Sequence, residues 1–273
     1  MPRVAIGIAL AVLQTFSELF AQHMQGWAAR HKRPVLQAVF AAMQILTGVI
    51  ELVAFQYAPM SVVIAVGLIG LIGNLATESG LSRRRILATL TIVATSGVAI
   101  YLGTSESNDD DAGKTHDAIT PLSIGMLAAH IVAFVLLVYR ARGLPRSKHK
   151  QKAVLYGAAI ALGITASSWA GVEMGNLAIR PGWSKQDWGV FFLLIFVAIA
   201  GTTAQQFAYL FIHGELDMHL ALCAVEAFSV PFSYVPSLLV LYQMQDVTWV
   251  NWGGIAVVHA VQLTAIASMA ADP

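Results

Sequence analysis

Residues 35–55 read VLQAVFAAMQILTGVIELVAF, and within this run only Gln37, Gln44, Thr47 and Glu51 are polar. About 20 mostly apolar residues are enough for a helix to cross the hydrocarbon core of a bilayer. The spacing of seven residues between Gln37, Gln44 and Glu51 places these side chains on one helical face. The run therefore predicts a membrane-spanning helix whose polar face turns toward other helices, because lipid cannot satisfy hydrogen-bonding groups.

The composition of the whole chain points the same way. Of its 273 residues, 57% are hydrophobic and 11% are charged, whereas soluble domains have about 25% charged residues. The net charge of +1 gives no overall attraction for nucleic acid. Cys223 is the single cysteine, which excludes an internal disulfide framework and a Cys-rich metal cluster. These numbers predict a polytopic membrane protein.

Further segments along the chain are as long and as apolar as 35–55, and the sequence predicts an all-α integral membrane protein with nine transmembrane helices. They lie at about 4–22, 35–55, 59–78, 86–103, 121–139, 153–175, 188–209, 217–241 and 249–270. Arg3 precedes the first segment as in a secretory signal, but Gln14, Glu18 and Gln22 interrupt the apolar run. We therefore expect a retained helix rather than a cleaved leader.

The basic residues predict the orientation of the spans. Twelve of the 16 Lys and Arg residues fall on the side opposite to the N-terminus: Arg30, Lys32, Arg33, Arg83, Arg84, Arg85, Arg140, Arg142, Arg146, Lys148, Lys150 and Lys152. Positively charged loops stay on the cytoplasmic side, or on the matrix side in an organelle. The N-terminus is thus predicted outside and the C-terminus inside, with an organellar inner membrane left open. The acidic run Asp109–Asp111 falls in the outer loop 104–120, where we expect solvated side chains.

The predicted spans repeat. The first four begin at about 4, 35, 59 and 86, and the last four at about 153, 188, 217 and 249. This spacing predicts a first four-helix repeat (1–103), a linking segment with the acidic loop, the fifth helix and the basic loop (104–152), and a second four-helix repeat (153–273). An offset of five spans inverts the second repeat relative to the first. Many secondary transporters have such an inverted 4+1+4-like arrangement, with the substrate site near the midplane where the halves meet.

Acidic residues within the predicted spans are candidates for a functional site, because an ionisable group in lipid costs several kcal/mol (~2–4) unless it is paired or hydrated. Glu18, Glu51, Glu173 and Glu226 qualify, and no Lys or Arg lies at comparable depth. We expect Glu18, Glu51 and Glu226 to hold a cation or to carry protons, with Glu51 and Glu226 as candidate metal ligands. Gln44 shares a face with Glu51 and Ser229 shares one with Glu226, while Gln206 belongs to the polar face of the predicted seventh span. All three are predicted to line the route.

A structural interpretation stays open for each of these residues. Polar side chains within spans also form hydrogen bonds between helices with no cavity at all. In the predicted eighth span, Pro231 and Pro236 follow Glu226 and remove helix hydrogen bonds, which predicts either an oxygen-rich cation site or a kink beside a hydrogen-bonded acid. His130 and His259 are interpreted as hydrogen-bonded core residues rather than metal ligands.

The sequence contains no nucleotide-binding loop, nucleophile elbow, paired-histidine motif or haem-attachment motif. We therefore expect no enzymatic activity and no resident cofactor, with Mg²⁺ considered only as a transported ion.

Two stretches resemble a known family. The sequence from Glu51 to Pro59, with Phe55-Gln56-Tyr57-Ala58-Pro59, resembles the second helix and turn of the NIPA-type magnesium transporters of the drug/metabolite transporter superfamily. The following residues 60–67 resemble the start of their third helix, and Glu78 resembles an acid that ends it. Gln206 with Tyr209 and Leu210 resembles part of their seventh helix. The resemblance implies nine spans with an outside N-terminus and transport by alternating access.

The chain also departs from the family pattern. Where the family has a Gly-Glu pair in the second helix, this chain has Thr47-Gly48, and its acid, Glu51, lies one turn later. Leu222 and Cys223 stand near the position of a Thr-Pro pair in the eighth helix.

Two functions therefore remain. The first is a transporter that moves a divalent cation or a small metabolite. The second is a transporter-like structural subunit without transport activity, in a larger organellar respiratory or photosynthetic membrane complex. Expected partners are membrane lipids, a small cation or metabolite, and other membrane subunits or a second copy of the chain, but not nucleic acid.

Overall fold

The computed structural model describes residues 2–54, 57, 60–77, 81–103, 120–178, 182–239 and 248–271. All regular structure within these ranges is helical. The helices are α1 (Pro2–Arg30), α2 (Pro34–Ala54), α3 (Met60–Thr77), α4 (Arg83–Gly103), α5 (Pro121–Gly143), the short 3-10 helix η2 (Arg146–Lys148), α6 (His149–Ala178), α7 (Lys185–Glu215), α8 (Met218–Leu239) and α9 (Trp249–Ala270). The predicted acidic loop around Asp109–Asp111, Glu78 and the Ala58-Pro59 turn lie outside the described residues.

Six of the described helices are long and apolar enough to cross a membrane: α1, α2, α5, α6, α7 and α9. The prediction of an all-helical fold compatible with a membrane protein is thus confirmed. Membrane crossing by α3, α4 and α8 stays a prediction. Several helices are longer than their apolar segments. α1, for example, continues through Gly26 to Arg30, and its Gln22 and Gln25 side chains are buried.

Local hydrogen bonds define where some of the helices begin. The Ser184 side chain accepts a hydrogen bond from the Asp187 backbone N–H, and the Asp187 carboxylate accepts one from the Ser184 backbone N–H. This reciprocal capping box satisfies amide groups that have no partner within α7. Thr120 and Ser123 make the equivalent pair at α5, where Pro121 begins the helix. These caps fix the start of both helices at the same side of the predicted topology.

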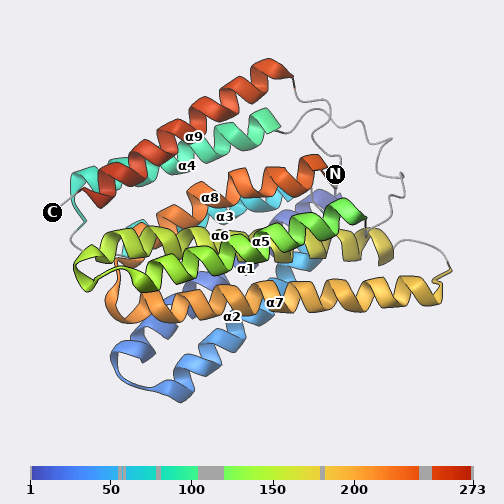
Figure 1. Cartoon of the computed structure of the whole chain (residues 1–273), viewed down its shortest axis with the longest axis horizontal. Coiled ribbons are helices and arrows are strands. Elements are labelled where there is room, and N and C mark those ends of the chain that lie inside the picture. The colour runs from blue at the N-terminus through green and yellow to red at the C-terminus, as the bar shows by residue number, and fades with distance from the viewer. Residues whose placement is uncertain are drawn as a thin grey trace.

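The helices pack in a recurring pattern. α1 packs on α2 and α3, and α6 packs on α7 and α8. α4 and α9 form a separate pair along one edge of the molecule (Figure 1). Polar contacts hold this pair together, since Gln262 donates to Ser96 Oγ at 2.8 Å and Asn251 donates to the Leu102 carbonyl at 3.3 Å. The centre of the molecule is enclosed by six other helices: α1, α2, α3, α6, α7 and α8.

Small residues allow the central helices to approach closely. A Cβ added to Gly157 on α6 would lie 2.5 Å from the Ala221 carbonyl oxygen of α8 and 2.7 Å from Ala224 Cβ. A Cβ on Gly163 would lie 2.9 Å from the Gly201 carbonyl oxygen of α7. Close backbone contact at small residues is how helices associate where lipid removes the hydrophobic driving force. Gly157 and Gly163 thus allow α6 to pack closely against both α8 and α7.

The helix ends predicted to carry most of the basic residues gather at one end of the bundle. In Figure 1 the α1–α2 turn, the start of α4, the α5–α6 connection and the C-terminal end of α9 lie at the left end. Here Arg85 of α4 pairs with Asp217, which precedes α8, at 2.6 Å between Nη2 and Oδ2. One turn further in, Thr89 Oγ1 lies 2.8 Å from His219 Nε2 of α8. These contacts join the two predicted repeats at that end.

Candidate functional site

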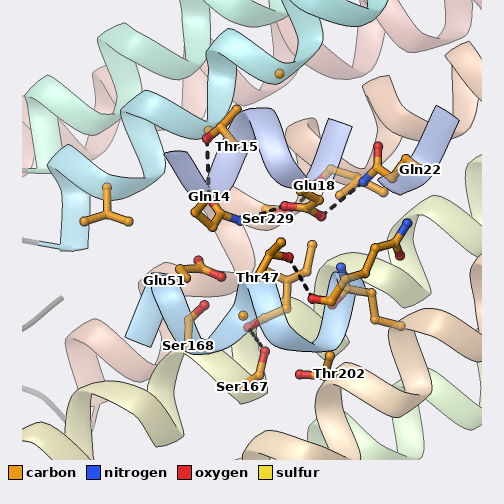
Figure 2. Close-up of a pocket in the computed structure, with 18 of the residues that line it drawn as sticks. Gln14, Thr15, Glu18, Gln22, Thr47, Glu51, Ser167, Ser168, Thr202 and Ser229 are labelled. Atoms are coloured by element: carbon orange, nitrogen blue, oxygen red, sulfur yellow. Dashed lines mark hydrogen bonds between the residues drawn. The ribbon is translucent and has the colours of Figure 1, made fainter. Parts of the chain in front are cut away.

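A cavity of about 210 Å³ lies at the centre of the six enclosing helices. Its walls come from α1, α2, α3, α6, α7 and α8, so both predicted repeats contribute. The volume is sufficient for several water molecules or one small solute. Figure 2 shows Gln14 and Glu18 of α1 on one side of the cavity, with Thr47 and Glu51 of α2 on the other.

Glu18 is held by two amides of its own helix. Gln14 Nε2 donates to Glu18 Oε2 at 2.7 Å, and Gln22 Nε2 donates to Glu18 Oε1 at 3.1 Å. Residues four apart on a helix lie on one face, so the four-residue spacing read from the sequence produces this clamp directly. Thr15 extends the chain of bonds by donating to Gln14 Oε1 at 3.3 Å (Figure 2). The clamp fixes the direction of the carboxyl group.

Glu51 and Glu226 also line the cavity, from α2 and α8. Both side chains are only partly buried, since they border the open volume. Glu51 is within electrostatic range of Glu18 and of Glu226. Neither Glu51 nor Glu226 makes a hydrogen bond or an ion pair with any other residue that the structure describes. The structure thus brings together Glu18, Glu51 and Glu226, the three acids predicted to hold a cation. Among the described residues, the carboxyl oxygens of Glu51 and Glu226 accept no hydrogen bond.

Gln44 and Ser229, also predicted from the sequence, border the same cavity. Gln44 Nε2 donates to Gln25 Oε1 at 3.1 Å, so the two polar helices α1 and α2 are linked by a buried amide pair. Gln44 Oε1 is buried and has no hydrogen-bond partner. Ser229 Oγ donates to the Val225 carbonyl at 2.7 Å, in the turn that carries Glu226.

Gln206 is not among the cavity-lining residues, whereas the neighbouring Gln205 is. Successive residues on a helix point about 100° apart, and a sequence pattern of Gln205 and Gln206 gives no means to choose between them. Glu173, the fourth acid within the spans, is buried but does not border the cavity. α8 continues through Pro231 as one helix to Leu239.

The two histidines fit the structural interpretation. His130 Nδ1 lies 2.9 Å from the Met126 carbonyl oxygen, and His259 Nδ1 lies 2.7 Å from Gln262 Oε1. Neither borders the cavity.

Several further residues line the cavity that were not selected as site residues from the sequence. α6 contributes Thr165, Ser167 and Ser168, and α7 contributes Thr202. Ser167 also lies at the close crossing of Gly163 and Gly201. A small hydroxyl residue suits both a tight helix contact and a polar wall, so its spacing alone does not separate the two roles.

The chemistry of the wall favours a positively charged occupant. Among the described residues that border the cavity, three are acids and none is Lys, Arg or His. Within the described part of the chain, no three His, Cys, Asp or Glu side chains lie close enough to hold a metal ion together.

Comparison of the chain with family models, with curated proteins and with solved structures gives no match.

Proposed function

We propose that this protein is a membrane transporter that moves a small cation, a divalent metal ion or a cationic metabolite, by alternating access. The observation that carries this proposal is a central cavity bordered by Glu18, Glu51 and Glu226 with no basic side chain among its described walls. If these acids only formed interhelical hydrogen bonds, an open volume beside them would not be expected, because a filled interior is more stable than one with a cavity.

The packing of the helices supports an inverted repeat. The contacts α1–α2, α1–α3 and α3–α4 have counterparts in α6–α7, α6–α8 and α8–α9. Most contacts between the halves follow the same exchange, since α1 packs on α7 as α6 packs on α2, and α2–α7, α3–α8 and α4–α9 each map onto themselves. The contact between α4 and α8 is an exception, because α3 and α9 do not pack together to the same extent. The proposal therefore includes nine spans in a 4+1+4 arrangement, with the cavity between the repeats.

The proposed orientation follows from the basic residues. Their clustering at the end of the bundle that holds Arg85 and η2 supports an inside location of this end, and an outside location of the N-terminus. A divergent member of the drug/metabolite transporter superfamily is the family assignment that we propose from the Glu51–Pro59 and Gln206–Leu210 resemblance. We further propose that the chain has no enzymatic activity.

The second candidate is a structural subunit of a larger membrane complex. The displaced acid, Glu51, favours it, because the family's Gly-Glu pair is missing. A subunit of this kind needs no water-filled route and no response to a cation. It is expected to purify only with its partner chains.

Water access to the cavity separates the two functions. Cys223 is the single cysteine of the chain, so Cys223→Ala gives a background without thiols. In this background we place Ser229→Cys at the cavity and, as a control, Thr264→Cys on the exposed face of α9, which we expect to face lipid. In sealed vesicles, a membrane-impermeant thiol reagent should modify the cavity cysteine from either side, and much faster than the control. Equal rates at both positions would contradict a hydrated route and favour the structural subunit.

Cation flux tests the acids themselves. In proteoliposomes, electrical currents evoked by a cation gradient should disappear in Glu51→Gln and in Glu226→Gln, because each change removes a negative charge from the cavity while keeping the side-chain shape. Glu173→Gln is the matched control, since this acid is buried away from the cavity. Flux that survives both cavity substitutions would contradict the assignment of these acids.

A further inference from the structure

We propose that the cargo of the central cavity is a small aliphatic amine in its ammonium form, held through its N–H groups by a wall made mainly of hydrogen-bond acceptors. This inference rests on the proposed transport function and names the chemical class of the cargo.

Five hydroxyl groups of the cavity wall have their hydrogens bound to the helical backbone. Each donates to a backbone carbonyl three or four residues earlier in its own helix, at 2.7 to 3.1 Å: Thr47, Thr165, Ser167, Thr202 and Ser229. Thr15, which also lines the cavity, donates instead to Gln14 Oε1. A hydroxyl group has one hydrogen and two acceptor lone pairs. With the hydrogen bound to the backbone, the oxygen can only accept from a molecule in the cavity.

The amide and carboxyl groups add further acceptors. Gln44 is 4% exposed, and its Oε1 has no hydrogen-bond partner although the nitrogen is bound by Gln25. A buried carbonyl without a donor costs about 1–3 kcal/mol, which a ligand N–H would recover. The carboxyl oxygens of Glu51 and Glu226 supply the negative charge, while Glu18 is already held by Gln14 and Gln22. An anion would find few donors in this wall.

The remaining wall is aliphatic. Between the polar groups, the cavity is bordered by side chains that include Leu19, Ile45, Val49, Ile164 and Ile199, and none of its described lining residues is aromatic. Methylene groups of an amine would gain from contact with these side chains, whereas a hydrated metal ion would not. A quaternary ammonium has no N–H to donate and is usually recognised by aromatic rings. The wall therefore favours primary ammonium groups on a short alkyl chain.

Binding to the purified full-length chain tests this class directly. Diaminobutane carries two primary ammonium groups at neutral pH and is the probe. The comparison ligands are its hexamethylated quaternary analogue, the neutral butanediol and Mg²⁺. Calorimetry and thermal unfolding in lipid nanodiscs should show binding and stabilisation by diaminobutane, with an affinity at least about tenfold above each comparison ligand, as expected for one charge-assisted hydrogen bond.

Matched variants locate the binding. Glu51→Gln and Glu226→Gln should each weaken diaminobutane binding by about tenfold or more, whereas Glu173→Gln should leave it unchanged. Thr202→Val removes one acceptor of the wall and should weaken binding. Thr264→Val, the same change at a hydroxyl that donates to the Ala260 carbonyl on the exposed face of α9, should not. If a cavity variant does not fold, protection of Ser229→Cys from the thiol reagent by diaminobutane, and not by the quaternary analogue, gives the same information.

Three results would overturn the proposal. They are binding of Mg²⁺, butanediol or the quaternary analogue as tight as that of diaminobutane, binding of none of the ligands, and unchanged diaminobutane binding in both Glu51→Gln and Glu226→Gln. If the cavity cysteine still reacts from both sides of the membrane, only the cargo class is wrong and the transport function stands. If it does not react, both proposals fail.

Discussion

Single residues at the basic end of the bundle connect the two halves of the chain. The Arg85–Asp217 pair has side chains that are 16% and 11% exposed, so it is partly shielded from solvent. Asp217 has a second task, because its Oδ1 accepts a hydrogen bond from the Leu220 backbone N–H at the start of α8. The charge of Asp217 thus holds α4, while its oxygen caps α8.

Asp217→Asn separates these two tasks. Asparagine keeps the capping oxygen and removes the charge, so we expect unfolding to become easier by about 1–2 kcal/mol, between an exposed and a fully buried pair. Asp217→Ala also removes the cap and should cost about 1 kcal/mol more. Chemical unfolding in detergent micelles measures both. A double-mutant cycle with Arg85→Gln is the control, and additive effects would show that the pair contributes nothing.

Among the candidate site residues, those on regularly spaced polar faces were predictable. The four-residue spacing of Gln14, Glu18 and Gln22 and the seven-residue spacing of Gln44 and Glu51 already place them on shared faces, and the cavity lies against those faces. The choice between Gln205 and Gln206 was not predictable. It depends on the rotation of α7 about its axis, which is fixed by the close contact of Gly201 with α6 and not by local sequence.

At the scale of helices, the crossing of α6 and α8 depends on the absence of a side chain at Gly157. The neighbouring atoms are the Ala221 carbonyl oxygen, Ala224 Cβ and the Val225 nitrogen, which are backbone atoms or the first atom of a side chain. None of them can rotate away, so a larger residue must separate the two helices. The prolines and glycines of a sequence show that such a contact exists, but not which partner helix it meets.

Gly157→Ala should therefore destabilise the protein by about 1–3 kcal/mol, in spite of the higher helix propensity of alanine. Gly125→Ala on α5 is the matched control, because a Cβ there meets nothing within 4 Å. We expect it to leave stability unchanged or to raise it slightly. Thermal unfolding of both variants in the same detergent checks the difference, and equal stability would contradict the close α6–α8 contact.

At the scale of the whole molecule, the helical class and the membrane character followed from composition and from the length of the apolar segments. Helix lengths were less predictable, since α1 and α7 both continue beyond their apolar segments, and in α1 the added turns include the buried Gln25. The cavity was predictable only as a hypothesis. A sequence shows which faces are polar, but whether those faces meet in a filled or an open interior depends on how six helices pack together.

The proposed orientation makes a prediction about the two ends of the bundle. In the Cys223→Ala background, Lys148→Cys in η2 and Lys185→Cys at the start of α7 place exposed thiols at opposite ends. An impermeant reagent applied outside should label the α7 position and not the η2 position. The reverse pattern in intact membranes would invert the orientation, and labelling of both positions from outside would contradict a membrane crossing by α6, which separates them.

The backbone-bound hydroxyl groups also affect which substitutions the residues that line the cavity can accept. Serine and threonine donate to a preceding helical carbonyl in the same way, so either residue at Thr47, Thr165, Ser167, Thr202 or Ser229 presents the same lone pairs to the centre. The acceptor character of the wall thus depends on the helical carbonyls that bind the hydroxyl hydrogens as well as on the identity of each residue. Substitutions between these two residues can accumulate over evolutionary time and lower sequence identity while the character of the binding surface is retained.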